Sequence, residues 1–383
     1  LNQNPDEYRK LMADPGLLPK MIPEIIRWQT PLTHMRRTAL ADWITPNLWE
    51  LGHLTGGETG DVAGAIAAPE VSATDQPAPS DSASHVPTAR LARSPRPMNA
   101  PLPDAIRKAL ESVTLDDKYA LESGRAFMSG TQALVRLPML QRQRDVAAGL
   151  NTAGFISGYR GSPLGGYDQA MWQAKKHMAA QNIVFQPGVN EELGATAVWG
   201  TQQLDLYPQS KKYDGVFGIW YGKGPGVDRC SDVFKHANMA GTTPWGGVIA
   251  VAGDDHISKS STAAHQSDHI FKACGLPVFF PANVQDILDQ GLHAIAMSRF
   301  AGIWSGMKTI QEIVESSATA HIDPERVQIV LPEFVMPPGG VHIRWPDTAL
   351  EQEARLFDYK WYAALAYIRA NKLNHNVIEG PNG

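Results

Sequence analysis

Cysteine is nearly absent from this chain, whose 383 residues include only Cys230 and Cys274. Two thiols cannot supply a disulfide framework, a zinc ribbon or the four thiolates that hold a [4Fe–4S] cluster. Two cysteines in a chain of this length are expected to be reduced thiols. The cysteine content therefore predicts a cytoplasmic protein.

The chain also lacks a strong charge of one sign and a long apolar run. Its 34 Lys and Arg residues stand against 39 Asp and Glu residues, which gives a net charge of −5. Without a basic field, nucleic-acid binding is not expected. No apolar run approaches the ~20 residues of a membrane span, and the N-terminus has no signal-peptide pattern. We therefore expect neither nucleic acid nor membrane among the partners.

Aromatic residues are missing between Trp49 and Tyr119. Within this stretch, Ala, Pro and Ser supply 20 of the 37 residues from 61 to 97. Such a composition buries too little apolar surface to offset the entropy lost on ordering. We therefore predict a largely disordered linker over residues 41–100, which separates a helical fragment at residues 1–40 from the rest.

The helical fragment contains a Glu-x-x-Arg pair, Glu24 and Arg27, followed by Arg37 in an Arg-x-Ala motif. With its flanking sequence, the segment 2–39 resembles bacterial haem-thiolate cytochrome monooxygenases. In that family the Glu-x-x-Arg helix is structural, and the second arginine meets a haem propionate. The resemblance breaks at Leu40, and the residues around Cys230 do not match the family's cysteine loop. We therefore expect a fused or misassembled fragment that binds no haem.

Beyond residue 126, short apolar runs alternate with helical patterns. The expected strands are 154–159, 183–186, 215–220, 247–252 and 278–280. The expected helices are 131–150, 165–180, 190–205, 227–240, 262–274, 283–299 and 351–371. Alternation at this spacing indicates βαβ units and a parallel sheet, with ligands at the carboxyl ends of the strands. The sequence thus predicts an α/β, three-layer domain over 101–345, followed by a helix and a connection over 346–383.

Gly-, Asp- and Glu-rich motifs follow the expected strands. They are Gly130-Thr131-Gln132, Tyr159-Arg160-Gly161-Ser162-Pro163, Asn190-Glu191-Glu192, Lys223-Gly224-Pro225-Gly226 and Gly253-Asp254-Asp255-His256. Taken singly, such a loop is usually a turn, and a first-turn glutamate usually compensates the helix dipole. His256, His265 and His269 lack the spacing of a metal site and are interpreted as polar lining, so no metal site is predicted here.

In their order, these motifs resemble the 2-oxoacid:ferredoxin oxidoreductases, specifically the long, fused indolepyruvate form, over residues 101–383. The resemblance implies a thiamine diphosphate pyrimidine-binding domain. It also implies oxidative decarboxylation of an aryl 2-oxoacid to acyl-CoA, with electrons passing to ferredoxin. Mg²⁺ and iron–sulfur clusters would come from domains absent from this chain, and the assembly would be a dimer. Alone, the chain would carry half an active site.

The same resemblance assigns roles to individual residues. Glu191, nine residues before Gly200, would be the catalytic carboxylate that activates the cofactor, with Glu192 as the alternative. The other cofactor-binding residues would be Gly224, Gly226, Asp254 and Asp255. The substrate-binding residues would be Tyr159, Arg160, Ser162, Lys259 and Ser260. Two positions depart from the family pattern, because Arg160 replaces a proline and Lys259 stands where short relatives carry histidine.

Two alternatives remain open at this point. The domain could be catalytically silent and serve subunit association through an exposed apolar face. The chain could also be a remnant of a haem monooxygenase, which the absence of a matching thiolate loop disfavours.

Overall fold

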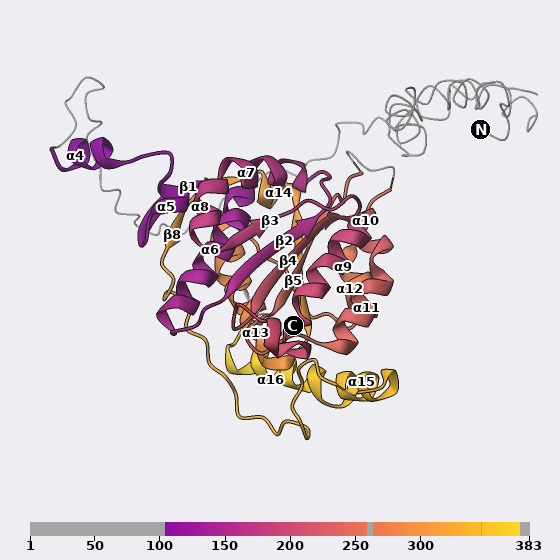
Figure 1. Ribbon diagram of the computed structural model, residues 1–383. Helices are drawn as coiled ribbons and strands as arrows, with labels where there is room; N and C mark the ends of the chain where they lie inside the picture. Colours follow the sequence, from indigo (N-terminus) through magenta and orange to yellow (C-terminus); the bar gives the residue numbers. More distant parts are fainter. Residues whose placement is uncertain (1–103, 259–262, 346, 376–383) are drawn as a thin grey trace, which may run out of the picture. The chain divides into compact units, whose positions relative to one another are not determined.

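The computed structural model describes residues 104–258, 263–345 and 347–375 (Figure 1). The expected helical fragment at 1–40, the expected linker at 41–100, and the candidate residues Lys259 and Ser260 lie outside these ranges. Within them, no helix has the length and apolar character needed to cross a membrane.

A parallel sheet of six strands forms the centre of the described domain, in the order β3-β2-β4-β5-β7-β6. Its strands are β2 (Ala153–Gly158), β3 (Ile183–Phe185), β4 (Val216–Lys223), β5 (Val248–Asp254), β6 (Val278–Phe279) and β7 (Trp304–Ile310). Every neighbouring pair is parallel, for example β4 with β5, where Gly218 faces Val248. This confirms the predicted fold class. Strand β7 was not expected from the sequence.

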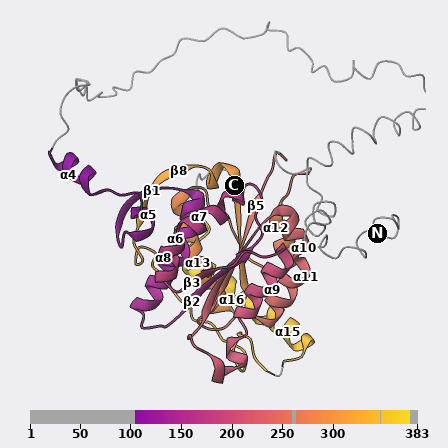
Figure 2. The same ribbon diagram turned by 45° about the horizontal axis from the view of Figure 1, so that its top comes forward.

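Helices cover both faces of this sheet, which gives three layers (Figure 2). One face packs against α6 (Gly130–Ala147), α7 (Tyr167–Gln173) and α13 (Val284–Ala301). The other face packs against α9 (Glu191–Thr201), α10 (Gly224–Arg229), α11 (Ser231–Ala240) and α12 (Ser267–Ala273). The remaining elements are α4 (Asp104–Ser112), α5 (Asp117–Ala120), α8 (Lys175–Ala180), α14 (Gln311–Val314) and the short 3₁₀ turns η3 (Leu164–Gly166), η4 (Leu204–Leu206) and η5 (Pro208–Ser210).

Alternate residues of the central strands point into the two cores. Ile219 and Tyr221 of β4 pack toward α6 and α13, whereas Trp220 packs toward α9 and α11. Because both faces are buried, these strands are apolar at nearly every position, as is usual for a covered parallel sheet. That is why their sequences stand out as short apolar runs.

A second, two-stranded sheet pairs β1 (Gly124–Ser129) with β8 (Ser317–Ile322) in antiparallel fashion. This pairing is not predicted from the sequence. Strand β1 leads directly into α6, where Ser129 and Gln132 form a capping box: the Ser129 hydroxyl accepts from the Gln132 N–H, and the Gln132 side chain accepts from the Ser129 N–H. Two orphan donors at the helix start are thereby satisfied.

Several expected helices are shorter or interrupted. The expected helix 351–371 consists of α15 (Ala349–Arg355), a π-helical turn η6 (Leu356–Lys360) and α16 (Trp361–Ala370). The expected helix 165–180 is divided into η3, α7 and α8, and helix 227–240 into α10 and α11. The breaks at 165–180 and 227–240 cannot be predicted from hydrophobic periodicity, because buried residues continue from α7 into α8 and from α10 into α11.

The π-helical turn η6 places a buried lysine, Lys360, at the end of α11. Lys360 is fully buried, and its Nζ donates to the carbonyls of Met239 at 2.9 Å and Asn238 at 3.3 Å, at the end of α11. The neighbouring Trp361 donates from Nε1 to the Gly275 carbonyl at 3.0 Å. These contacts fasten the C-terminal helix to the α11 side of the domain.

Candidate functional site

The strand order reverses between β2 and β4. From β2 the chain moves to β3 on one side and then crosses to β4 on the other. In open α/β sheets, the crevice at the carboxyl ends of the strands on either side of such a switch point is the usual ligand site. The segments that follow β2 and β4, and the start of α9, meet there.

The start of α9 lies directly on the end of β2. A Cβ at Gly194 would be only 2.9 Å from the Gly158 Cα, closer than side-chain carbons approach backbone atoms. The Gly188 N–H donates to the Gly158 carbonyl at 2.7 Å. These glycines therefore let the N-terminus of α9 reach the switch point.

Glu191 is the first residue of α9, and the side chain of Asn190 caps the helix by accepting from the Leu193 N–H at 2.8 Å. The Glu191 side chain is only 13% exposed, whereas Glu192, one residue on, is exposed. The Glu191 carbonyl accepts from the Trp220 Nε1 at 3.0 Å. Helix position and β4 together thus turn Glu191, not Glu192, toward the interior.

The Glu191 carboxylate has few partners. Arg229 Nη1 lies 3.7 Å from its Oε2, and the Arg229 side chain is largely exposed. Among the described residues, no hydrogen bond to this carboxylate is formed. A nearly buried carboxylate at the positive end of a helix, with one weak ion pair, retains acceptor capacity for a ligand.

Gly226 and Gly224, at the start of α10, make room for protein side chains. A Cβ at Gly226 would lie 2.5 Å from the Glu191 Cγ. A Cβ at Gly224 would lie 2.3 Å from the His265 Cβ. The space above each glycine is therefore taken by Glu191 or His265, so that these glycines position side chains.

His265 is held between two acceptors. Its Nε2 lies 3.0 Å from the Asp228 Oδ2, and its Nδ1 lies 3.1 Å from the Ala263 carbonyl. His269 Nε2 lies 3.1 Å from the Gln266 Oε1. Over the described ranges, no group of three or more His, Cys, Asp or Glu residues has the geometry to hold a metal ion.

The loop after β2 lies beside the end of β4. The Tyr159 N–H donates to the Tyr221 carbonyl at 3.1 Å, and a cis peptide joins Ser162 to Pro163. Tyr159 and Arg160 are exposed, and Ser162 is partly buried. The three predicted substrate-binding residues of this loop therefore lie together at the surface.

Lys223, the last residue of β4, packs against this loop. A Cβ at Gly161 would lie 3.0 Å from the Lys223 Cβ. Burial lowers the pKa of Lys223, and the charge of Asp255 acts in the opposite direction. No role is predicted for Lys223 from the sequence, although its place immediately before Gly224 is a signal. Lys223 brings a cation to the switch point.

The two predicted aspartates at the end of β5 differ in their surroundings. Asp254 is fully buried and accepts from the Ser267 N–H at 2.8 Å and from the Ser267 hydroxyl. Its Oδ2 also lies 3.8 Å from the Nζ of Lys308, which donates to Asp268 at 2.8 Å. Asp254 is thus engaged in joining β5 to α12. Asp255 is nearly buried beside it.

Cys230 lies in the core between the sheet and the layer of α9 to α12. Burial raises the pKa of its thiol, and the nearby charge of Glu191 raises it further. Cys230 and Cys274 are both buried and unpaired. Neither thiol therefore has the exposure or the thiolate character of a nucleophile or a haem ligand.

Comparisons with known proteins give partial matches. No family model matches the chain. A segment of 42 residues is 40% identical to cytochrome P450-terp from Pseudomonas sp, and it covers 11% of this chain and 10% of that protein. In fold, the chain is similar to a 2-oxoglutarate:ferredoxin oxidoreductase from Magnetococcus marinus, solved with 2-oxoglutarate, coenzyme A and succinyl-CoA bound. That match has a TM-score of 0.43 at 14% identity and covers 67% of this chain and 47% of that one. The chain thus spans less than half of the oxidoreductase and a tenth of the cytochrome.

Proposed function

We propose that this chain carries the pyrimidine-binding half-site of a thiamine diphosphate-dependent 2-oxoacid:ferredoxin oxidoreductase. The substrate would be an aryl 2-oxoacid of the indolepyruvate type, converted to acyl-CoA with electrons passing to ferredoxin. Mg²⁺ and iron–sulfur clusters would be held by partner domains, and the assembly would be a dimer. The motif order in the sequence motivates the proposal.

One observation carries it: the Glu191 carboxylate stands nearly buried at the switch point, with no hydrogen-bond donor of its own among the described residues. This fits the cofactor, because an aminopyrimidine ring presents at N1′ a group that such a carboxylate can bond and hold protonated. A glycine at position 226 is needed for this placement of Glu191, because any side chain at position 226 would displace the Glu191 side chain.

When bound, thiamine diphosphate supplies the electron sink that decarboxylation of a 2-oxoacid requires. The protein's part is to position and protonate. Glu191 would accept a hydrogen bond from the proton at N1′ and hold that proton in place. Trp220 fixes the backbone of Glu191 through its Nε1 hydrogen bond.

The loop after β2 would face the substrate. The Arg160 guanidinium could form a bidentate pair with the 2-oxoacid carboxylate, and the Ser162 hydroxyl could hydrogen-bond its ketone. Lys223 adds a second cation beside this loop. Lys259 and Ser260 keep their proposed substrate-binding roles from the sequence.

The test compares Glu191→Gln with Glu192→Gln in this chain assembled with the partner domains that would hold the diphosphate and Mg²⁺. Saturation-transfer NMR measures contact with added thiamine diphosphate, and proton exchange at its C2–H in D₂O measures activation. We expect the parent and Glu192→Gln to accelerate exchange, and Glu191→Gln to lose about 10²–10⁴-fold of that acceleration, the usual range of general acid–base catalysis.

Exchange at the parent rate in Glu191→Gln, with loss in Glu192→Gln, would show that the wrong glutamate has been chosen. A parent assembly that neither contacts the cofactor nor accelerates exchange would favour the silent association domain. Val189 and Leu193, which are exposed on either side of Glu191, are the observation that keeps this second function in view.

A further inference from the structure

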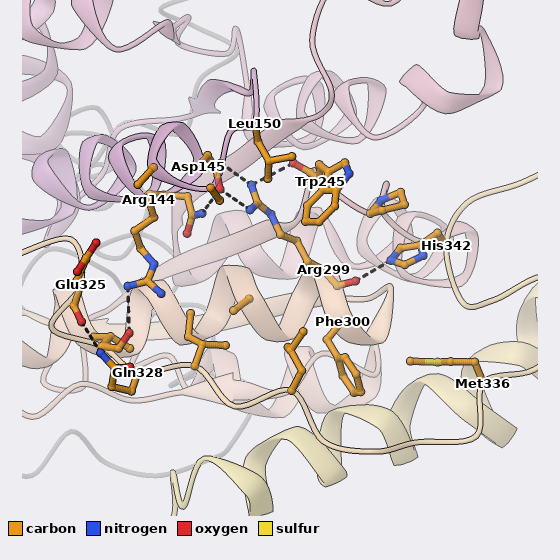
Figure 3. Close-up of a pocket in the computed structure, with 18 residues that line it drawn as sticks. Arg144, Asp145, Leu150, Trp245, Arg299, Phe300, Glu325, Gln328, Met336 and His342 are labelled. Atoms are coloured by element: carbon orange, nitrogen blue, oxygen red, sulfur yellow. Dashed lines mark hydrogen bonds and ion pairs between the residues drawn. The ribbon is translucent and has the colours of Figure 1, made fainter.

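A pocket lies at the amino edge of the sheet, at the other end of the strands from Glu191. Its volume is about 790 Å³. The C-terminal halves of α6 and α13, the loop before β5 and the irregular segment 325–342 enclose it (Figure 3). Pockets of ~300–1,000 Å³ are the usual size for small-molecule ligands.

Two charged residues that line the pocket form an ion pair with each other. Arg299 forms a bidentate pair with Asp145, from Nη1 to Oδ1 at 2.7 Å and from Nη2 to Oδ2 at 2.8 Å. Asp145 also accepts from Gln141 at 2.8 Å and from Thr152 at 2.7 Å. With its oxygens fully engaged, this pair forms a neutral wall and attracts no ligand ion.

Arg144 differs from Arg299. Its Nη1 donates to the carbonyls of Val327 at 3.0 Å and Pro324, and no carboxylate lies within ion-pair distance among the described residues. The Nε and Nη2 atoms of Arg144 form no hydrogen bond with the described residues. Burial lowers the pKa of Arg144, yet a guanidinium remains charged at neutral pH. Arg144 therefore offers donors and positive charge to an anion.

The rest of the lining is largely apolar. Trp245, Phe300 and Met336 contribute large side chains beyond Arg144 (Figure 3), and Ile329 also lines the pocket. Trp245 remains 46% exposed. Covering this surface with an apolar ligand would be favourable, because apolar area is removed from water.

We propose that this pocket binds an amphiphilic monocarboxylate, an acid with one carboxylate and an apolar chain or ring. The carboxylate lies on Arg144, and the apolar body lies against Trp245, Phe300 and Met336. Charge complementarity selects the acid over a neutral molecule of the same length. Glu325, exposed at the same end, disfavours ligands with a second negative charge.

Isothermal titration of the full chain with decanoate and with 1-decanol tests the proposal. We expect decanoate to bind about 10- to 100-fold more tightly, as one hydrogen-bonded charge pair allows. Arg144→Met should abolish this difference, and Arg144→Lys should retain most of it, with circular dichroism confirming that both variants fold.

Ala148→Trp, which places an indole in the pocket from an exposed position, should weaken both ligands about tenfold or more. Val146→Trp, on the exposed outer side of α6, is the matched control and should bind as the parent does. Equal affinity of the parent for acid and alcohol would overturn the proposal. So would a persistent preference for the acid in Arg144→Met, or equal effects of the two tryptophan variants.

Discussion

Replacing Lys360 with methionine should change the stability of this protein in a pH-dependent way. Burial is the main reason that the pKa of Lys360 falls from its ordinary 10.5 to about 7; the charge of Arg355 lowers it further, and Asp347 opposes the shift. In its neutral form, the amine has two hydrogens, which match the two α11 carbonyls that it contacts.

The sign follows from proton uptake. Between about pH 7 and pH 10.5 the unfolded chain keeps Lys360 protonated while the folded chain does not, so the free energy of unfolding rises with pH. The slope is at most about 1.4 kcal/mol per pH unit. This contribution is fully present above the unfolded pKa and is lost as pH falls through the folded pKa. Lys360 should therefore stabilise the fold by about 2 kcal/mol more at pH 9 than at pH 7.

Lys360→Met fills the same space but leaves the carbonyls of Asn238 and Met239 without this donor. Unsatisfied buried acceptors cost about 1–3 kcal/mol. We therefore expect the variant to be less stable than the parent by about 2 kcal/mol at pH 9 and nearly equal to it at pH 7.

Urea unfolding followed by tryptophan fluorescence, from pH 6 to pH 9, measures the parent-minus-variant difference, in which the other titrating groups cancel. Lys235→Met, at an exposed position of α11, is the control and should give a flat difference. A Lys360→Met difference that does not vary over this pH range would refute the reasoning.

Two further changes test the strand-end crevice and the wall of the pocket. Gly226→Ala should move the Glu191 carboxylate, because the new Cβ would lie 2.5 Å from its Cγ. Alanine has a higher helix propensity than glycine by about 1 kcal/mol, which offsets the cost of this crowding. We therefore expect cofactor-stimulated C2–H exchange to fall while the melting temperature stays unchanged. A Gly226→Ala protein with parental exchange would contradict this. Asp145→Asn should cost about 3 kcal/mol in urea unfolding by leaving Arg299 buried without a charge partner; a loss under 1 kcal/mol would show that the pair is dispensable.

The strands that could be predicted are those whose burial is visible in composition. Strand β5, Val248–Asp254, is an apolar run because both of its faces are covered, and it was expected at 247–252. Strand β7 escaped because it carries Ser305 and Thr309. Their hydroxyls are buried but satisfied by the carbonyls of Ala294 at 2.9 Å and Ala252 at 2.8 Å. Polar residues whose partners are distant in sequence look like loop residues until the fold is known.

The sequence could predict the position of a site residue within its own helix or strand, but not its contacts with other elements. The motif after β3 places Glu191 in a first helical turn, and the structure has it there. Its contact with Gly226 and its separation from solvent depend on how α9 and α10 meet, which no local pattern encodes. Likewise, the sequence could not show that Asp254 is already engaged by Ser267.

The antiparallel pairing of β1 with β8 has a consequence for how this domain acquires its structure. Gly124 faces Ile322, so the whole α/β alternation lies within the loop that this pairing closes. Closing so long a loop is entropically costly until the elements inside it are compact. The small sheet should therefore form after the parallel one, and hydrogen exchange during refolding should protect β5 before β1.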